Sequence, residues 1–125
     1  MTVSRLRVGV IGYGYWGPNL VRNFQELEDA EVVSVCDIRR ERREHFEKQY
    51  PGLTISEDWQ ELVRSPAVDA VVVATPVSTH YQIAREALQQ GKDVFVEKPL
   101  ALGADKAGAL IELSQRRQRT LMVGH

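Results

Sequence analysis

The sequence has little of what several common protein classes require. Its 125 residues include one cysteine, Cys36, so no internal disulfide can form, and Cys36 is expected to pack as a small hydrophobe. A net charge of −1 argues against a broad nucleic-acid-binding surface. No apolar run approaches the ~20 residues of a membrane span, and residues 1–5 lack a long apolar stretch. We therefore expect a cytoplasmic protein with neither nucleic-acid nor membrane partners.

What the sequence does have is a regular alternation of apolar runs and amphipathic stretches. With 43% hydrophobic and 26% charged residues, it has the composition of a single soluble domain. The runs expected to form buried strands are 6–11, 32–36, 53–55, 69–74, 93–96 and 120–123. The stretches between them predict helices, the first of which carries Val21, Phe24 and Leu27 on one face. This order predicts an α/β fold in which helices cover both faces of a doubly wound parallel sheet.

A glycine motif stands where the first strand gives way to the first helix. Gly12, Gly14 and Gly17 have the spacing G-x-G-x-x-G, and Asp37 follows Gly17 by 20 residues, at the end of the second strand. Gly12 permits a tight turn, Gly14 lets the backbone approach a pyrophosphate, and Gly17 lets helix and strand pack closely. Asp37 can accept hydrogen bonds from a ribose. The arrangement is the fingerprint of a dinucleotide-binding domain, against the alternative of a glycine-rich turn without a ligand.

The residues around this motif leave two questions open. Tyr13, Tyr15 and Trp16 can flank the dinucleotide or pack the turn against neighbouring loops. The arginines that follow Asp37 can form a solvated helix face, or Arg39 can contact the adenine or its ribose. An arginine here can also neutralise the 2′-phosphate of NADP, which the charge of Asp37 opposes. We expect NAD as the cofactor, with NADP tolerated.

Two further strand ends carry candidate site residues. Thr75 and Pro76 follow the fourth strand, so their turn is expected to line the cofactor groove, with Ser78 or Thr79 capping the next helix. His80 lies in the first turn of that helix, where a structural hydrogen bond to a neighbouring loop is favoured over acid-base chemistry. Glu97, Lys98 and Pro99 follow the fifth strand. A lysine there can hold a substrate hydroxyl and pass a proton, although a surface lysine is the commoner reading of spacing alone.

Together these motifs resemble one family of oxidoreductases. The segments 10–17, 36–37, 74–80 and 96–101 closely resemble the amino-terminal half of the glucose-fructose oxidoreductase/inositol dehydrogenase/rhizopine catabolism (Gfo/Idh/MocA) family. The resemblance covers essentially the whole chain, and its Glu-Lys-Pro motif is highly specific. Residues 15–19 and 75–81 are most similar to dehydrogenases that oxidise nucleotide-linked amino sugars, such as UDP-linked ones.

The resemblance implies a role for each candidate. It implies NAD(P) binding by Gly12, Gly14, Gly17 and Asp37, with Thr75, Pro76 and His80 lining the groove. It implies that Glu97 contacts the nicotinamide end and that Lys98 is the catalytic lysine, assisting hydride transfer between a sugar or cyclitol CH–OH group and the nicotinamide. No metal site is expected.

The sequence also departs from that family. Members carry a second α+β domain that supplies the substrate pocket and most of the oligomer interface, and it is absent from residues 1–125. We therefore expect a Rossmann domain from a longer two-domain, homo-oligomeric enzyme, inactive by itself. Two alternatives remain: a non-catalytic dinucleotide-binding or redox-sensing module, and an unrelated α/β domain whose glycine turn binds nothing.

Overall fold

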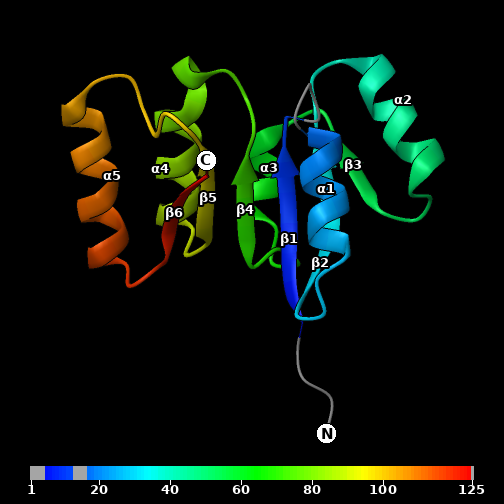
Figure 1. Ribbon diagram of the computed structural model, residues 1–125, viewed down its shortest axis with the longest axis horizontal. Helices are drawn as coiled ribbons and strands as arrows, with labels where there is room; N and C mark the ends of the chain where they lie inside the picture. The colour runs from blue at the N-terminus through cyan, green and yellow to red at the C-terminus, as the bar shows by residue number, and fades with distance from the viewer. Residues whose placement is uncertain (1–4, 13–16, 125) are drawn as a thin grey trace, which may run out of the picture.

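The computed structural model describes residues 5–12 and 17–124, which alternate strand and helix from end to end (Figure 1). The strands are β1 Leu6–Ile11, β2 Ala30–Cys36, β3 Thr54–Ser56, β4 Ala70–Val73, β5 Asp93–Glu97 and β6 Leu121–Gly124. The helices are α1 Gly17–Gln25, α2 Arg40–Gln49, α3 Trp59–Arg64, α4 His80–Gln89 and α5 Ala104–Arg116, with a short 3₁₀ turn, η1, at Val77–Thr79. Tyr13, Gly14, Tyr15 and Trp16 lie outside the described residues.

The described strands form one parallel sheet in the order β3-β2-β1-β4-β5-β6. The chain runs outward from β1 to one edge, returns to the centre at β4 and continues to the other edge. This reversal between β1 and β4 is the switch point of a doubly wound sheet, where the crossovers on either side leave space for a ligand. The predicted α/β fold class is therefore confirmed.

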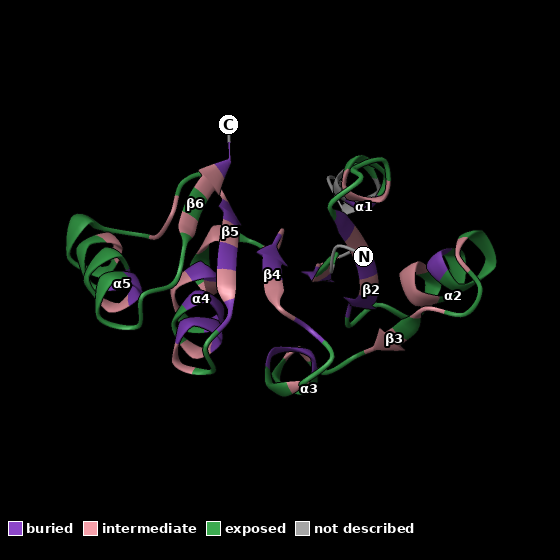
Figure 2. Cartoon of the chain, turned by 90° about the horizontal axis from the view of Figure 1, so that it is seen from below, coloured by how far each residue is buried: buried purple, intermediate pink, exposed green. Residues whose placement is uncertain are grey.

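Helices cover the sheet from both sides and bury two separate apolar layers (Figure 2). On one face, Phe46 of α2 and Val21 of α1 pack against Val8 and Val10 of β1. On the other face, α3 and α4 pack against the sheet and α5 packs against α4, and Leu88 and Leu110 are fully buried there. Because β1 and β4 are covered on both sides, their sequences are continuously apolar rather than alternating.

One predicted helix boundary and one predicted side-chain cap were wrong. Helix α1 ends at Gln25, so Leu27 lies beyond it and is 50% exposed instead of sharing the buried face with Val21. Helix α4 takes no side-chain cap from Ser78 or Thr79, because residues 77–79 form the turn η1 and the Thr79 hydroxyl is engaged elsewhere. In contrast, Asp58 caps α3 by accepting a 2.9 Å hydrogen bond from the Gln60 amide.

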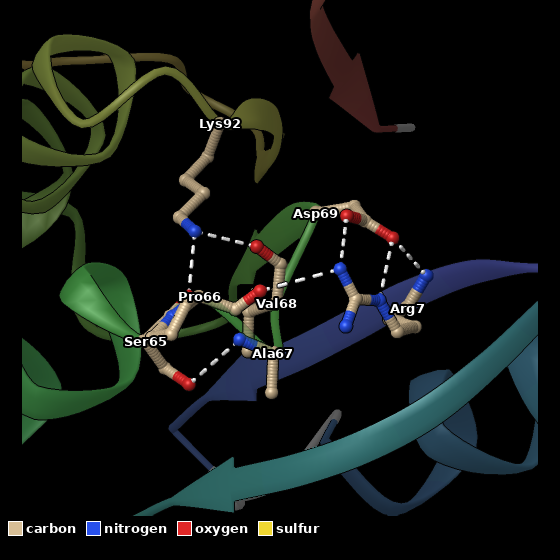
Figure 3. Close-up of polar contacts among 7 residues, drawn as sticks. All are labelled: Arg7, Ser65, Pro66, Ala67, Val68, Asp69 and Lys92. Atoms are coloured by element: carbon tan, nitrogen blue, oxygen red, sulfur yellow. Dashed lines mark hydrogen bonds and ion pairs between the residues drawn. The ribbon is translucent and has the colours of Figure 1, made fainter.

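A polar cluster closes the amino edge of the sheet (Figure 3). Arg7 of β1 forms a 2.9 Å ion pair with Asp69, which directly precedes β4. The buried Lys92, just before β5, donates to the carbonyl oxygens of Ser65 at 2.6 Å and Val68 at 2.5 Å. These contacts hold the loop from α3 to β4 at the amino edge of the sheet. The candidate residues lie at the opposite, carboxyl edge.

None of the described helices is both long and apolar enough to cross a membrane.

Candidate dinucleotide site

The carboxyl edge of the sheet is built from the residues that directly follow β1, β2 and β4. Hydrogen bonds continue the sheet one residue past the strands, from the Gly12 amide to the Cys36 carbonyl at 2.7 Å and from the Ala74 amide to the Ile11 carbonyl at 2.9 Å. The Asp37 amide likewise donates to the Ser56 carbonyl at 3.1 Å. The turns that carry Gly12, Asp37 and Ala74 are therefore held by the sheet itself.

Gly12 occupies a position that only glycine fits well. Its φ is +89°, in the region that side chains disfavour. A Cβ atom at this position would lie 2.8 Å from both the Ala74 carbonyl oxygen and the Thr75 Cγ2. The close approach of the Gly12 and Thr75 turns thus depends on the missing side chain, as the glycine motif predicts.

A cavity of about 640 Å³ opens at this edge. Its walls come from the ends of β1, β2 and β4 and from the first turns of α3 and α4; they comprise Ile11, Gly12, Cys36, Asp37, Ile38, Arg39, Trp59, Ala74, Thr75, Pro76, Thr79, Gln82 and Ile83. A volume of this size accommodates a small organic ligand or half of a dinucleotide. Most of the lining is apolar, which suits the flat faces of a purine, while Asp37 and Arg39 supply the charged groups that can fix its orientation.

Several lining residues have no counterpart among the sequence-based candidates. Ile38 is 80% exposed although it is a large apolar side chain, and it lies beside Asp37 on the wall of the cavity. Trp59 reaches the same cavity from the start of α3, and Gln82 and Ile83 from α4. Cys36 is also in the wall, and burial raises the pKa of its thiol to about 12, so it stays uncharged near neutral pH.

Asp37 and Arg39 form a close ion pair at the mouth of this cavity. The Asp37 side chain is 3% exposed, whereas that of Arg39 is 45% exposed. Arg39 Nη2 donates to Asp37 Oδ2 at 2.9 Å and Nε donates to Oδ1 at 3.1 Å. These hydrogen bonds to Asp37 raise the pKa of the Arg39 guanidinium. Arg39 thus pairs with the Asp37 carboxylate in this structure, and its expected contact with adenine or its ribose stays a prediction.

The amino end of α1 faces the same edge, since α1 follows the turn after β1. The first turn of α1, which begins at Gly17, contains no acidic residue that would neutralise the positive end of the helix. Such helix ends favour phosphate groups. The glycine turn, the cavity and the helix end therefore fit a dinucleotide.

The turn after β4 is joined to the turn after β5 by one side chain. His80 is 2% exposed, and its Nε2 lies 2.7 Å from the Thr75 carbonyl oxygen, while its Nδ1 lies 2.9 Å from the Pro99 carbonyl oxygen. Thr75 and Pro76 line the cavity, whereas His80 stands behind them. The structure therefore gives His80 the expected hydrogen bond to a neighbouring loop and not a place in the cavity wall.

The Glu-Lys-Pro motif lies at the end of β5. Glu97 is half-buried and pairs in register with Gly124 of β6, and Lys98 is exposed, with a cis peptide bond to Pro99. Neither Glu97 nor Lys98 is part of the cavity wall formed by the described residues. Glu97 and Lys98 lie at the same carboxyl edge as Gly12 and Asp37, but on the opposite side of β4 from Asp37. An extended dinucleotide bound along this edge requires such a separation between the residues that contact its two ends.

No cluster of three or more metal-ligating side chains occurs within residues 5–12 and 17–124. The polar groups of the carboxyl edge instead include one ion pair, a helix amino end, backbone groups and the side chains of Thr75, Thr79 and Gln82. These groups can bind a ribose and phosphates, and Lys98 follows β5 at the same edge of the sheet.

Comparisons with known proteins agree with this description. A family model for an oxidoreductase family with an NAD-binding Rossmann fold, Gfo/Idh/MocA, matches residues 6–125. A myo-inositol 2-dehydrogenase from Thermotoga maritima is 30% identical over 95% of the chain, and a glycosyl hydrolase family 109 protein from Streptomyces filamentosus is 32% identical, also over 95% of the chain. The chain spans 36% and 26% of these two relatives.

Among solved structures, the chain is similar to a 3-ketoreductase from Actinomadura kijaniata in complex with TDP-benzene and NADP. The two superpose with a TM-score of 0.90 at 29% identity, over 97% of this chain and 37% of the ketoreductase. The similarity thus extends over nearly all of the described fold and about a third of the larger protein.

Proposed function

The chain belongs to the Gfo/Idh/MocA oxidoreductase family with an NAD-binding Rossmann fold, and we propose that it is the cofactor half of a dehydrogenase acting on a CH–OH group of a sugar or cyclitol. The observation that carries this proposal is the carboxyl edge, where Gly12 and Asp37 flank the cavity at the switch point between β1 and β4. The adenosine half of the dinucleotide would occupy the cavity, with the pyrophosphate at the amino end of α1.

The nicotinamide end would then lie toward β5, where Glu97 and Lys98 stand. A bound nicotinamide supplies the acceptor or donor of a hydride. Oxidation of an alcohol also requires that the proton of the hydroxyl be removed, and we assign this proton to Nζ of Lys98, which accepts it as a neutral amine and becomes the ammonium. Glu97 would contact the nicotinamide, while His80 would hold the Pro99 turn that carries Lys98.

The substrate class rests on similarity to relatives. One relative is a myo-inositol 2-dehydrogenase and another is a glycosyl hydrolase, which supports a polyhydroxylated ring as the substrate. The structural similarity to a ketoreductase bound to a TDP derivative supports the narrower proposal of a nucleotide-linked sugar. Because the chain spans about a third of these proteins, we also propose that a second domain of the whole protein completes the substrate pocket and makes its oligomer contacts.

The cofactor proposal is tested by titrating the chain with NADH and NADPH and following tryptophan fluorescence. Trp59 lines the cavity, so binding of the adenosine half is expected to quench its emission saturably. The Trp59→Phe variant identifies how much of the signal comes from this residue, since Trp16 is the only other tryptophan. The absence of saturable binding of either dinucleotide would refute the proposal.

The catalytic proposal is tested in the whole protein with a panel of inositols and nucleotide-linked sugars. Lys98→Ala is expected to lower kcat by at least about 100-fold while the Kd for NADH stays within a factor of about two. Lys48→Ala, which removes an exposed lysine from α2, is the matched control and should leave both values unchanged. Undiminished turnover in Lys98→Ala would remove this lysine from the mechanism.

A further inference from the structure

Strands β5 and β6 have the sequences of strands that are covered on both faces. Residues 94–96 and 121–123 are apolar without a break, and helices cover both faces of nearly all parallel strands of this kind. On the face that α4 covers, the valines of β5 are buried. On the opposite face, Phe95 is half-buried and Met122 is 54% exposed. The described residues therefore cover one face of these two strands and leave much of the other face bare.

The described helices lie elsewhere on the sheet (Figure 2). Helix α1 packs on β1 and β2, and α2 packs on β3, whereas α3, α4 and α5 lie on the opposite side. Phe24 of α1 touches the rim of the bare face, where its ring meets that of Phe95 edge to face at a centroid distance of 6.3 Å. The stretches 1–4 and 13–16 are too short for a helix that spans two strands, since four residues make about one turn. A covering helix therefore has to come from outside residues 1–125.

The bare face is apolar. Phe95 and Met122 pair in register, so their side chains stand next to each other on the two strands. Gly124 lies two residues further along β6 and leaves room for the aromatic ring, because a Cβ atom there would lie 2.5 Å from Phe95 Cζ. We call the surface formed by Phe24, Phe95, Met122 and Gly124 the β5–β6 face. Its aromatic rings and flexible thioether are suited to packing against the apolar side of a helix.

We propose that the polypeptide that follows residue 125 in the whole protein packs a helix on the β5–β6 face. The chain spans 26 to 37% of the relatives described above, so a longer whole protein is expected. Figure 2 shows the carboxyl end of β6 directed toward the side of the sheet where α1 lies, so a segment that continues from β6 starts beside this face. Its attachment also gives it a high effective concentration there, which favours it over a second copy of the chain. The inference rests on the second domain included in the proposed function.

The position of this face connects it to the proposed chemistry. Phe95 precedes Glu97 by two residues and Lys98 by three, at the end of the same strand. A helix packed on Phe95 would therefore hold the second domain, and the substrate with it, in a fixed position relative to Nζ of Lys98. The adenosine cavity is lined from the ends of β1, β2 and β4 and from α3 and α4, and not from this face. Loss of docking is therefore expected to leave NADH binding intact.

Oxidation of Met122 by hydrogen peroxide, followed by mass spectrometry of the peptide that contains it, measures whether the face is covered. In the 125-residue chain we expect a rate within about threefold of the rate in urea, because the side chain is 54% exposed. In the whole protein we expect the same methionine to react at least roughly tenfold more slowly, because the docked helix excludes the oxidant.

Met122→Lys tests the same contact by placing a charge on the face. An edge strand tolerates a lysine in water, whereas burial of its charge under a helix is costly. In the 125-residue chain, Tm should stay within about 3 °C of the original. In the whole protein, the midpoint of the first thermal transition should fall by at least about 5 °C, while the Kd for NADH stays within about twofold.

Ile111→Lys is the matched control, since it introduces the same charge at a large apolar residue of α5 that is 47% exposed. It should leave both transitions and the Kd for NADH unchanged.

The outcomes separate this inference from the proposed function. Equal oxidation rates of Met122 in the two proteins would overturn the inference and leave the dinucleotide site untouched. Protection that appears in the 125-residue chain as its concentration rises would assign the face to a second copy and would also overturn it. A Met122 that is protected in a whole protein unable to bind NADH would support the docking and refute the cofactor proposal.

Discussion

His80 joins Pro99 across 19 residues of chain: its Nδ1 lies 2.9 Å from the Pro99 carbonyl oxygen, deep behind the wall of the cavity. Its other ring nitrogen lies 2.7 Å from the Thr75 carbonyl oxygen. Both neighbours are backbone carbonyl oxygens, and the tautomer of the imidazole determines which ring nitrogen donates. One imidazole ring thus connects the turn that lines the cavity to the turn that carries the Glu-Lys-Pro motif.

Replacing His80 with Phe keeps a buried ring but removes both ring nitrogens. The part-buried contacts with the Thr75 and Pro99 carbonyl oxygens are then lost, and we expect the free energy of unfolding to fall by about 2 kcal/mol. The affinity for NADH should also fall, because the Thr75 turn lines the cavity. Urea unfolding and fluorescence titration measure the two effects. His80→Asn can still donate to one of the carbonyls, so its free energy of unfolding should lie between those of the original chain and His80→Phe. Equal stability of all three proteins would contradict the bridging role.

The doubly wound parallel sheet and the glycine turn could be predicted from the sequence because they depend on local patterns. Continuous apolar runs such as 70–73 form strands that are buried on both faces, and helices must then cover both faces. The conformation of Gly12 likewise depends on a turn that is closed within a few residues. Periodicity was less informative at helix ends: Leu27 continues the 3.6-residue pattern although α1 has already ended at Gln25.

The composition of the cavity wall could not be predicted in the same way. Trp59 and Gln82 are far from Asp37 in sequence and reach the cavity only because the crossovers from β3 and β4 bring α3 and α4 to the same edge. The contact between Asp37 and Arg39 is local, but a run of arginines leaves open which of them turns back to the carboxylate. Side-chain direction at a strand end depends on packing that sequence spacing does not specify.

A substitution at Gly12 should damage both folding and binding. Gly12→Ala places a Cβ 2.8 Å from the Ala74 carbonyl oxygen and forces alanine to a φ of +89°. We expect a loss of roughly 2 kcal/mol of unfolding free energy, together with weaker NADH binding. Gly108→Ala is the matched control, because no atom lies within 4 Å of a Cβ built at that position in α5. It should instead stabilise the chain by about 0.5–1 kcal/mol, as alanine is the better helix former.

Denaturant unfolding of the two alanine variants distinguishes these effects. A Gly12→Ala protein as stable as the original would show that the turn relaxes easily. In that case the close approach of the Gly12 and Thr75 turns would not depend on glycine.

Lys92 is expected to contribute to stability through its hydrogen bonds at the amino edge of the sheet (Figure 3). Burial lowers the pKa of its ammonium group, although the charge of Asp69 opposes this shift. Lys92→Met keeps an unbranched side chain that ends at Cε, but leaves the Ser65 and Val68 carbonyls without the Nζ donor. We expect a loss of about 1–3 kcal/mol in urea unfolding, with an unchanged Kd for NADH because the cavity is at the opposite edge. A variant that lost NADH affinity without losing stability would contradict this assignment.

Cys36 should be unreactive in the folded chain although it lies in the cavity wall. Burial, and to a lesser extent the charge of Asp37, raises the pKa of its thiol from 9.0 to about 12. Since the thiolate is the reactive form, three pKa units correspond to about 1,000-fold less of it at pH 8. Iodoacetamide labelling followed by mass spectrometry should therefore be slower by roughly this factor in the folded chain than in urea. Cys36 is the one cysteine, so any labelling reports on it alone.

The same shift predicts how stability changes in alkali. A thiol whose pKa is higher in the folded state than in the unfolded state stabilises the fold fully below pH 9, and this contribution is lost as the pH rises from about 9 toward 12. Cys36→Ala lacks the titrating group, so the difference in unfolding free energy between this variant and the original chain should change across that window and stay constant between pH 6 and 8. Urea unfolding at several pH values measures this difference. A constant difference up to pH 11, together with fast labelling at pH 8, would show that the Cys36 thiol ionises as freely as in the unfolded chain.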